Sequence, residues 1–231
     1  MATSTRMWGD VAWGGYATAI RAHERFVFPI PDALPLEQAA PMLCAGLTVY
    51  SPLVRNGAGP GKVVGIIGIG GLGHFAIQFA KALGAEVVVF SHSPSKKDSA
   101  MELGASTFVA TADNGFAKEW HGKVDLIVCT ADVSHGLALN DYISTLSTNG
   151  RFIMAALPDD NLPPINAFSL AMNGGLIGGT HIGSKKEVVQ MLKLAVEKGV
   201  KSHIEILPMS EVGKALQNVK DNKVRYRHVL K

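Results

Sequence analysis

Hydrophobic and polar positions divide most of this chain into two kinds of segment that alternate from residue 62 onward. Short runs rich in Val and Ile have the length and composition of buried strands, and the longer segments between them have helical spacing. The runs predict strands just after Lys62 and at residues 87–90, 107–110, 124–129, 151–156 and 176–179. Helices are predicted at 76–83, 96–103, 137–146 and 184–198. Strands that alternate with helices indicate an α/β fold with a doubly wound parallel sheet.

The remaining segments follow a different pattern. Residues 11–31 hold short β-branched, aromatic and proline-containing runs, which predict strands and turns of a β-rich module too short to close a sheet of its own. Residues 36–55 predict a helix. The tail predicts a strand at 203–207, a helix at 210–220 and a strand at 224–230. Glycines stand directly after the predicted helices at 76–83, 96–103 and 184–198, where helix ends favour them. Ser184 is the predicted N-cap of the last of these helices.

A glycine-rich turn separates the first strand from the first helix of this alternating part. Gly68 permits a tight turn, Gly70 allows a phosphate to approach the backbone, and Gly73 allows the helix to pack closely on the strand. Gly71 and Leu72 lie between them, and the helix is expected to begin near Gly71. A strand before the turn and a helix and a strand after it indicate a dinucleotide site, with the pyrophosphate at the helix N-terminus. The alternative is an ordinary glycine-rich turn.

The end of the second strand indicates which dinucleotide binds. A site for NAD usually has Asp or Glu here, whereas this chain has Ser91 and no carboxylate from residue 87 to residue 97. Hydroxyl groups and cations suit a 2′-phosphate, which an acid would repel. NADP(H) is therefore the predicted cofactor. The residues available to the phosphate are Ser91, His92, Ser93, Ser95, Lys96 and Lys97, although the two lysines are also a common solvated start to a helix.

Composition narrows the possible partners and the compartment. The chain is 47% hydrophobic and 18% charged, a normal globular balance, and its net charge of +3 is too small to indicate a nucleic-acid partner. No run of about eighteen apolar residues exists, so no membrane partner is expected. There are two cysteines, Cys44 and Cys129, and no CxxC pattern, which favours a reducing, cytoplasmic compartment. Cys129 is expected in the core, and His74 is expected to form a hydrogen bond at the helix start.

Several stretches together carry a resemblance to a known family. They are Gly14-Gly15-Tyr16-Ala17, Phe28-Pro29-Ile30-Pro31, Ala40-Pro41-Met42-Leu43-Cys44-Ala45-Gly46-Leu47-Thr48, Gly68-Ile69-Gly70-Gly71-Leu72-Gly73-His74, Ser91-His92-Ser93 and Val224-Arg225-Tyr226-Arg227. With them the chain resembles the zinc-dependent medium-chain alcohol dehydrogenases, and within these the NADP-dependent branch that is like cinnamyl alcohol dehydrogenase. The resemblance covers nearly the whole chain after residue 10.

The resemblance implies a fold, an activity and a set of site residues. It implies a Rossmann domain at 46–199, with remnants of a GroES-like β-rich catalytic domain at 1–45 and 200–231. Cys44 corresponds to a ligand of the catalytic zinc, and Thr48 lies near the nicotinamide. Further cofactor contacts are implied at Thr180, Ile182 and Arg227. Cofactor contacts are also expected at Thr130 and Ala156, because these residues lie at the carboxyl ends of predicted strands, where ligands bind in open α/β sheets. The implied substrate is a small primary alcohol or aldehyde, and members of the family are often homodimers.

The sequence also departs from that family. It contains no Gly-His-Glu segment, which carries other zinc ligands in such enzymes, and no four-cysteine zinc loop. Catalytic zinc needs three protein ligands and an open position. The chain is therefore expected to correspond to the C-terminal two-thirds of such an enzyme, without tightly bound zinc and with weak or no activity. The alternative is a non-catalytic NADP(H)-binding fragment or degenerate paralogue; Cys44 disfavours a zinc-free quinone reductase.

Overall fold

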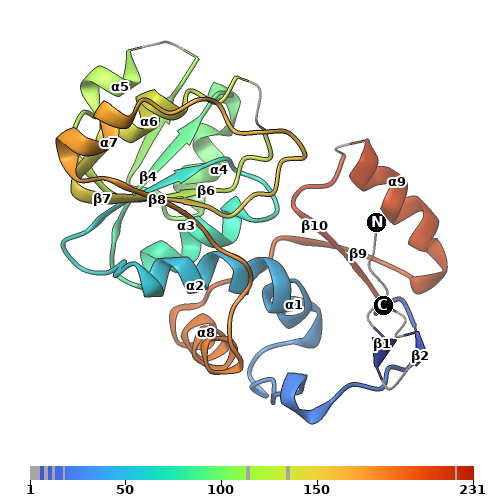
Figure 1. Ribbon diagram of the computed structural model, residues 1–231. Helices are drawn as coiled ribbons and strands as arrows, with labels where there is room; N and C mark the ends of the chain where they lie inside the picture. Colours follow the sequence, from blue (N-terminus) through green and yellow to red (C-terminus); the bar gives the residue numbers. More distant parts are fainter. Residues whose placement is uncertain are drawn as a thin grey trace.

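A six-stranded parallel sheet forms the main body of the protein. The structure is a computed structural model that describes residues 6–7, 10–11, 14–17, 19–112, 115–133, 136–221 and 223–231. The strand order is β5-β4-β3-β6-β7-β8, and every neighbouring pair is parallel (Figure 1). The strands are β3 (Val63–Ile67), β4 (Glu86–Ser91), β5 (Thr107–Ala110), β6 (Val124–Cys129), β7 (Leu146–Met154) and β8 (Leu176–Gly179). The order reverses between β3 and β6, and the predicted doubly wound α/β sheet is confirmed.

The strand β7 differs most clearly from its predicted bounds. The sequence predicts a strand at residues 151–156, but β7 runs from Leu146 to Met154. It continues through Asn149, which has a φ of 59°, and Gly150. A register shift against β6 between Val124 and Leu126 accommodates this irregular stretch.

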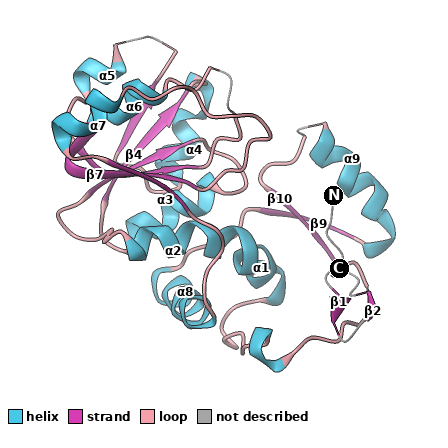
Figure 2. Ribbon diagram, viewed as in Figure 1, coloured by secondary structure: helices cyan, strands magenta, loops and turns pink. Residues whose placement is uncertain are grey.

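Helices cover both faces of the sheet. Side chains of β4 alternate between the two layers, since Val87 and Val89 belong to one core cluster and Val88 and Phe90 to the other. Helices α2 (Leu47–Arg55), α3 (Gly73–Ala82) and α8 (Lys185–Lys198) pack together on the first face, where the residues of α4 (Lys97–Glu102) also join the core. Helices α5 (Phe116–Glu119), α6 (Leu139–Thr145) and α7 (Ala167–Asn173) cover the second (Figure 2).

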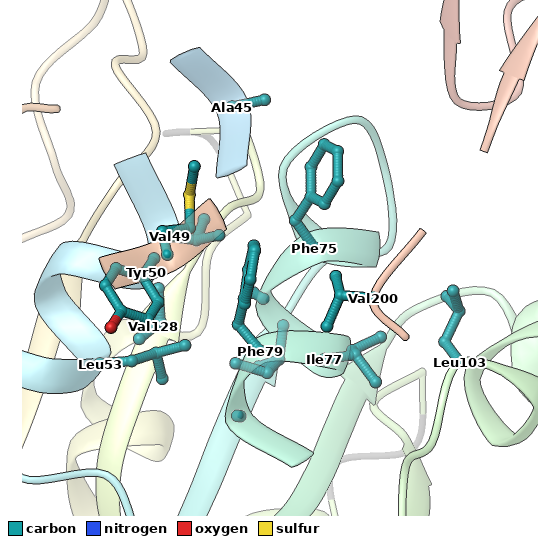
Figure 3. Packing of buried hydrophobic residues seen from close by; sticks show 14 of the residues in the cluster. Ala45, Val49, Tyr50, Leu53, Phe75, Ile77, Phe79, Leu103, Val128 and Val200 are labelled. Atoms are coloured by element: carbon teal, nitrogen blue, oxygen red, sulfur yellow. The ribbon is translucent and has the colours of Figure 1, made fainter. Parts of the chain in front are cut away.

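Aromatic side chains connect α3 to α2 in the first layer (Figure 3). The ring of Phe79 on α3 is fully buried and meets the edge of Tyr50 on α2, with 5.5 Å between ring centroids and an interplanar angle of 67°. Phe75 stacks on the other side of Phe79, one helical turn closer to the glycine turn. Leu53 and Val128 complete the contact between the helices and β6. The start of α3 is therefore held in place by a packed apolar layer.

Helix ends follow the sequence signals closely. Gly84, Gly104 and Gly199 have φ values of 91°, 105° and 68°, a region that favours glycine, and each follows its helix as predicted. Ser184 and Glu187 form a capping box at the start of α8. Helix α3 begins at Gly73 rather than near Gly71 as predicted, because residues 68–72 remain in the turn.

Residues 36–55 form three helical segments instead of the single predicted helix. Helix α1 (Leu36–Pro41) passes into a π-helical turn (Met42–Gly46) and then into α2. Gly46 sits against neighbouring helices, since a Cβ there would lie 3.2 Å from Sδ of Met191. The wider turn places Cys44 on the exposed side of the segment. π-Turns of this kind are frequent at functional sites.

Two small sheets lie outside the main body. β1 (Arg6–Met7) pairs antiparallel with β2 (Asp10–Val11), and β9 (Ile204–Leu207) pairs parallel with β10 (Arg227–Leu230). A 3₁₀ turn (Met209–Glu211) and α9 (Val212–Lys220) connect β9 to β10 in a lobe apart from the main sheet (Figure 1). The last strand begins at Arg227 rather than at residue 224.

The strands predicted within residues 14–31 are wrong for the described part of that range. It contains a 3₁₀ turn (Glu24–Phe26) and otherwise irregular backbone, while residues 12–13 and 18 lie outside the described residues. Gly14, Gly15, Pro29 and Pro31 weaken strand propensity. The sequence missed α5 and α7, which are only four and seven residues long. Among the described residues, no helix is long and apolar enough to cross a membrane.

The Phe79 contact predicts a measurable loss of stability. Phe79→Ala should lower the free energy of unfolding by about 3–5 kcal/mol, because it removes a fully buried ring and leaves a cavity. Val189→Ala, at a 43% exposed position on α8, is the control and should change it by less than about 0.5 kcal/mol. Urea denaturation of both variants measures this difference. Equal stability of the two variants would show that the Phe79 contact does not hold the helix layer.

Candidate dinucleotide-binding site

The glycine turn lies at the carboxyl end of β3, where the strand order reverses. Gly68 has a φ of 91°, and its N–H donates to the carbonyl of Phe90 on β4 (3.2 Å). A Cβ on Gly68 would lie 3.0 Å from the backbone nitrogen of Ala131, which follows β6. Backbone from three neighbouring strands therefore meets at this turn. Ligands bind at such a point in open α/β sheets.

Gly73 allows the start of α3 to approach the end of β3 closely. A Cβ at Gly73 would stand 2.0 Å from the carbonyl oxygen of Gly68, so no larger residue fits unless the backbone moves. The hydroxyl of Thr130 donates to the carbonyls of Ile67 and Gly68 (2.9 and 3.1 Å) and holds the end of β3 from the β6 side. Gly70 is the opposite case: its Cβ would meet no heavy atom within 4 Å. The structure therefore leaves open space at the one glycine where the sequence predicts a phosphate.

Arg227 reaches the turn from the far end of the chain. Its Nε donates to the carbonyl of Gly71 (3.1 Å), and a Cβ on Gly71 would lie 2.5 Å from that nitrogen. Burial lowers the pKa of Arg227, yet a guanidinium stays charged at any ordinary pH. A permanent positive charge thus lies beside the start of α3, where the helix dipole already favours an anion.

His74 is completely buried just inside α3. Its Nδ1 lies 3.2 Å from the carbonyl oxygen of Gly70, which confirms the predicted hydrogen bond at the helix start. The pKa of His74 is lowered to about 4, mainly by desolvation and in smaller part by the neighbouring His203 and Arg227, although the bond to Gly70 opposes the shift. The imidazole is therefore neutral at pH 7.

A cavity of about 470 Å³ opens on one side of the turn, between β3, β4 and β6. The predicted residues Gly68, Ser91, His92, Ser93 and Lys96 all line it. The Oγ of Ser91 accepts from the N–H of Ser93 (3.3 Å), and Nζ of Lys96 donates to the carbonyl of Ile69 (3.4 Å). None of the described lining residues is Asp or Glu. The described lining of this cavity therefore offers hydroxyl groups and the Lys96 ammonium to a ligand and no carboxylate.

A second cavity, of about 330 Å³, lies on the other side of the turn. Eight predicted site residues line it: Cys44, Thr48, Leu72, Thr130, Ala156, Thr180, Ile182 and Arg227. Ile182 has a φ of 44°, which is unusual for a β-branched residue and is the kind of backbone strain that gathers at functional sites. The structure thus brings every predicted site residue to the glycine turn or to one of the two cavities described above. The binding roles of these residues stay predictions.

Sequence reasoning missed other residues of these cavities. Thr111 and Tyr142 line the first cavity, and burial raises the pKa of Tyr142 to about 12, so the phenol stays protonated. Asp132 lines the second cavity and lies just beyond the end of β6, a position that could have identified it. His181 stands between the predicted Thr180 and Ile182 and also lines this cavity. Tyr142 lies on a helix, and no local pattern indicates it.

The described residues do not form a zinc site by themselves. Cys44 is free and exposed, and no group of three or more His, Cys, Asp or Glu side chains within the described ranges lies close enough to hold a metal ion. One thiolate does not satisfy a metal that takes three or four protein ligands. Cys129 is buried as predicted, and burial raises the pKa of its thiol to about 11, so it is no candidate ligand either.

Comparison with known proteins places this geometry among dehydrogenases. A family model described as zinc-binding dehydrogenase matches residues 71–197. NADP-dependent alcohol dehydrogenase 6 of Saccharomyces cerevisiae is 40% identical over 225 residues, which are 96% of this chain and 62% of that protein. The chain therefore spans less than two-thirds of the length of this relative.

Solved structures agree with the sequence matches. A cinnamyl alcohol dehydrogenase from Sorghum bicolor superposes with a TM-score of 0.80 and 38% identity over 87% of this chain and 57% of that protein. A structure of the corresponding enzyme from Helicobacter pylori, complexed with NADP(H), gives a TM-score of 0.73 and 32% identity over 85% of this chain and 55% of that one. The fold around the glycine turn is therefore shared with these enzymes.

Gly73 and Gly70 predict opposite responses to the same substitution. Gly73→Ala should lower the free energy of unfolding by about 3 kcal/mol or more, because its Cβ would overlap the carbonyl of Gly68. Gly70→Ala should change it by less than about 1 kcal/mol, because its Cβ meets open space. Thermal and urea denaturation of both variants compare them. A Gly73→Ala protein as stable as Gly70→Ala would contradict the close approach of α3 to β3.

His74 predicts a loss of stability in acid. Its pKa is about 4 in the folded protein and near 6.5 in the unfolded chain, so the unfolded chain takes up the proton first. The contribution of neutral His74 to the free energy of unfolding is fully present above about pH 6.5. It is lost as the pH falls through 4, by up to about 3 kcal/mol. Urea denaturation from pH 7 to pH 4 should show this loss in the wild type and a smaller one in His74→Phe. Parallel profiles for the two proteins would refute it.

Proposed function

Because the chain belongs to the zinc-binding dehydrogenase family, we propose that it is the NADP(H)-binding part of an oxidoreductase that interconverts primary alcohols and aldehydes. The observation that carries this proposal is the glycine turn itself. The turn has free space at Gly70 and no space for a side chain at Gly73. It is flanked by a cavity whose described lining has hydroxyl groups and a lysine but no carboxylate. The name of the yeast relative and the NADP(H) complex of the Helicobacter pylori enzyme support the choice of cofactor.

In this proposal the turn binds the pyrophosphate. The free space over Gly70 accepts the phosphates, and the first N–H groups of α3 face them. Arg227 adds a fixed positive charge beside the carbonyl of Gly71. Backbone amides and a guanidinium are the donors that suit phosphate oxygens best.

The first cavity takes the adenosine end and its 2′-phosphate. Ser91 stands where an NAD enzyme usually has its carboxylate. Its hydroxyl accepts a hydrogen bond from the N–H of Ser93 (3.3 Å), and the long bond that it donates to the carbonyl of Ser93 (3.5 Å) would be exchanged for one to a phosphate. Lys96 extends from the next helical turn to the carbonyl of Ile69, within the glycine turn. His92 and Ser93 complete the polar rim of this cavity.

The second cavity takes the nicotinamide and the substrate. NADP(H), when bound, supplies the hydride. Leu72 and Ala156 present apolar surface that displaces water from the ring, whereas Thr48 and Thr180 offer hydroxyls to orient it. The Oγ of Thr180 is buried without a hydrogen-bond partner in the described structure, which suits a donor or acceptor waiting for a ligand group.

The proposal extends to the organisation of the protein. We assign the Rossmann domain to residues 46–199 and the catalytic-domain portions to 1–45 and 200–231, in agreement with the β3–β8 sheet lying inside the first range. A cytoplasmic location is favoured because both cysteines are free. A homodimer is supported by exposed apolar side chains beside the edge strand β8, namely Phe168, Met172 and Leu176.

A second candidate function is NADP(H) binding without catalysis. It is favoured by the lack of a metal-ligand group among the described residues, since Cys44 alone does not bind zinc tightly. Elemental analysis after dialysis, together with NADPH oxidation on a panel of aromatic aldehydes, separates the two functions. About one zinc per chain with steady turnover supports the dehydrogenase, and NADPH binding without zinc or turnover supports the second candidate.

Ser91 predicts the cofactor preference. The wild type should bind NADPH more tightly than NADH, and Ser91→Asp should weaken NADPH binding by about 1.5–3 kcal/mol, because a carboxylate would repel the 2′-phosphate. Fluorescence titration with both cofactors measures this difference. Ser210→Asp adds the same charge at an exposed position on the segment between β9 and α9 and serves as the control.

Two outcomes of that titration contradict the proposal. Equal affinity of the wild type for NADPH and NADH would remove the role of Ser91. Unchanged NADPH affinity in Gly70→Val, with circular dichroism showing a folded protein, would mean that the open space above Gly70 is not the pyrophosphate site.

A further inference from the structure

Two consecutive peptide groups of the glycine turn are held by side chains. The carbonyl oxygen of Gly70 accepts from the backbone N–H of His74 (3.1 Å) and lies 3.2 Å from its Nδ1. The carbonyl oxygen of Gly71 accepts from Nε of Arg227 (3.1 Å). The first peptide group is therefore held by the His74 backbone N–H and by its side chain, and the second by the side chain of Arg227.

The bond to Gly70 fixes the tautomer of His74. A carbonyl oxygen only accepts, so Nδ1 must carry the proton and Nε2 must be bare. Nε2 is buried and has no hydrogen-bond partner in the described structure. A neutral imidazole with a single donor therefore directs that donor at the glycine turn.

Holding these carbonyls also orients the amides on the other side of each peptide plane. Both peptide bonds are trans, so the N–H of Gly71 points opposite to the carbonyl of Gly70, and the N–H of Leu72 points opposite to that of Gly71. Neither amide donates to a group in the described part of the chain. The two free donors are therefore directed away from the carbonyls that His74 and Arg227 hold.

We propose that His74 is a positioning residue for the cofactor: its Nδ1–H holds the Gly70–Gly71 peptide so that the N–H of Gly71 faces the phosphates. This inference rests on the proposed NADP(H) site. His74 does not touch the cofactor in this arrangement and acts only through the backbone. Donors that already point at a charged ligand need no reorganisation when the ligand binds.

A purely structural role for His74 makes a different prediction. Its ring stacks on Tyr226 with 5.0 Å between centroids and an angle of 7° between planes, and His203 meets both rings edge-on at 5.8 Å. If only this packing matters, any planar ring will replace His74. If the hydrogen bond matters, a side chain with a donor in the position of Nδ1 will replace it, even without the ring.

Two variants separate the roles. His74→Phe keeps the stack on Tyr226 and loses the donor, and His74→Asn keeps an N–H near the position of Nδ1 and loses the stack. His74→Phe should bind NADPH about tenfold more weakly than the wild type, the effect of one hydrogen bond, and His74→Asn within about twofold of it. Fluorescence titration gives the affinities, and urea denaturation shows that each variant is folded.

The outcomes distinguish this inference from the proposed function. A wild type that does not bind NADPH overturns both. A wild type that binds NADPH, with His74→Phe binding equally well or His74→Asn binding worse than His74→Phe, overturns the positioning role and leaves the proposed function intact. If neither variant folds, ¹⁵N NMR of the wild-type protein decides. A proton on Nδ1, together with a shift of the Gly71 amide when NADP⁺ is added, supports the inference, and a proton on Nε2 or an unmoved amide overturns it.

Discussion

The close approach of α3 to the end of β3 is the constraint on which the site depends. A Cβ at Gly73 would lie 2.0 Å from the carbonyl of Gly68, so the helix can begin this near to the strand only because residue 73 is glycine. The approach places the first N–H groups of α3 at the point where the strand order reverses between β3 and β6. The apolar layer around Phe75 and Phe79 holds the helix in that position (Figure 3). The two cavities lie on either side of this junction.

The far end of the chain completes the same turn. Tyr226 and Arg227 are neighbours in sequence, and they contact the turn at successive points, Tyr226 through the ring of His74 and Arg227 through the carbonyl of Gly71. Arg227 also lines the second cavity. The segment after residue 200 therefore stabilises the shape of the turn and contributes charge to it. The proposed cofactor site is therefore shared between the main sheet and this segment, whose strands β9 and β10 form a sheet of their own.

The parts that the sequence predicted well depend on local patterns. β5, β6 and β8 have the predicted bounds, because buried parallel strands read as short apolar runs. The glycines that end α3, α4 and α8 were also identified, because a left-handed residue after a helix favours glycine wherever it occurs. The NADP(H) preference follows from the residue types alone, since Ser91 occupies the usual place of an acid.

The parts that the sequence did not predict depend on contacts between distant segments. The π-helical turn at Met42–Gly46 and the continuation of β7 through Asn149 are responses to packing and register, which have no local signature. Tyr142 reaches the first cavity from a helix, and Asp132 reaches the second from a loop. The stack of His74 on Tyr226 joins the first helix of the alternating part to the tail of the chain.

A crystal structure of this chain with NADP⁺ tests the central claim most directly. The expected density has the pyrophosphate at the amides of Gly71 and Leu72 and the 2′-phosphate beside Ser91 and Lys96, and a cofactor bound elsewhere, or none at saturating NADP⁺, would contradict it.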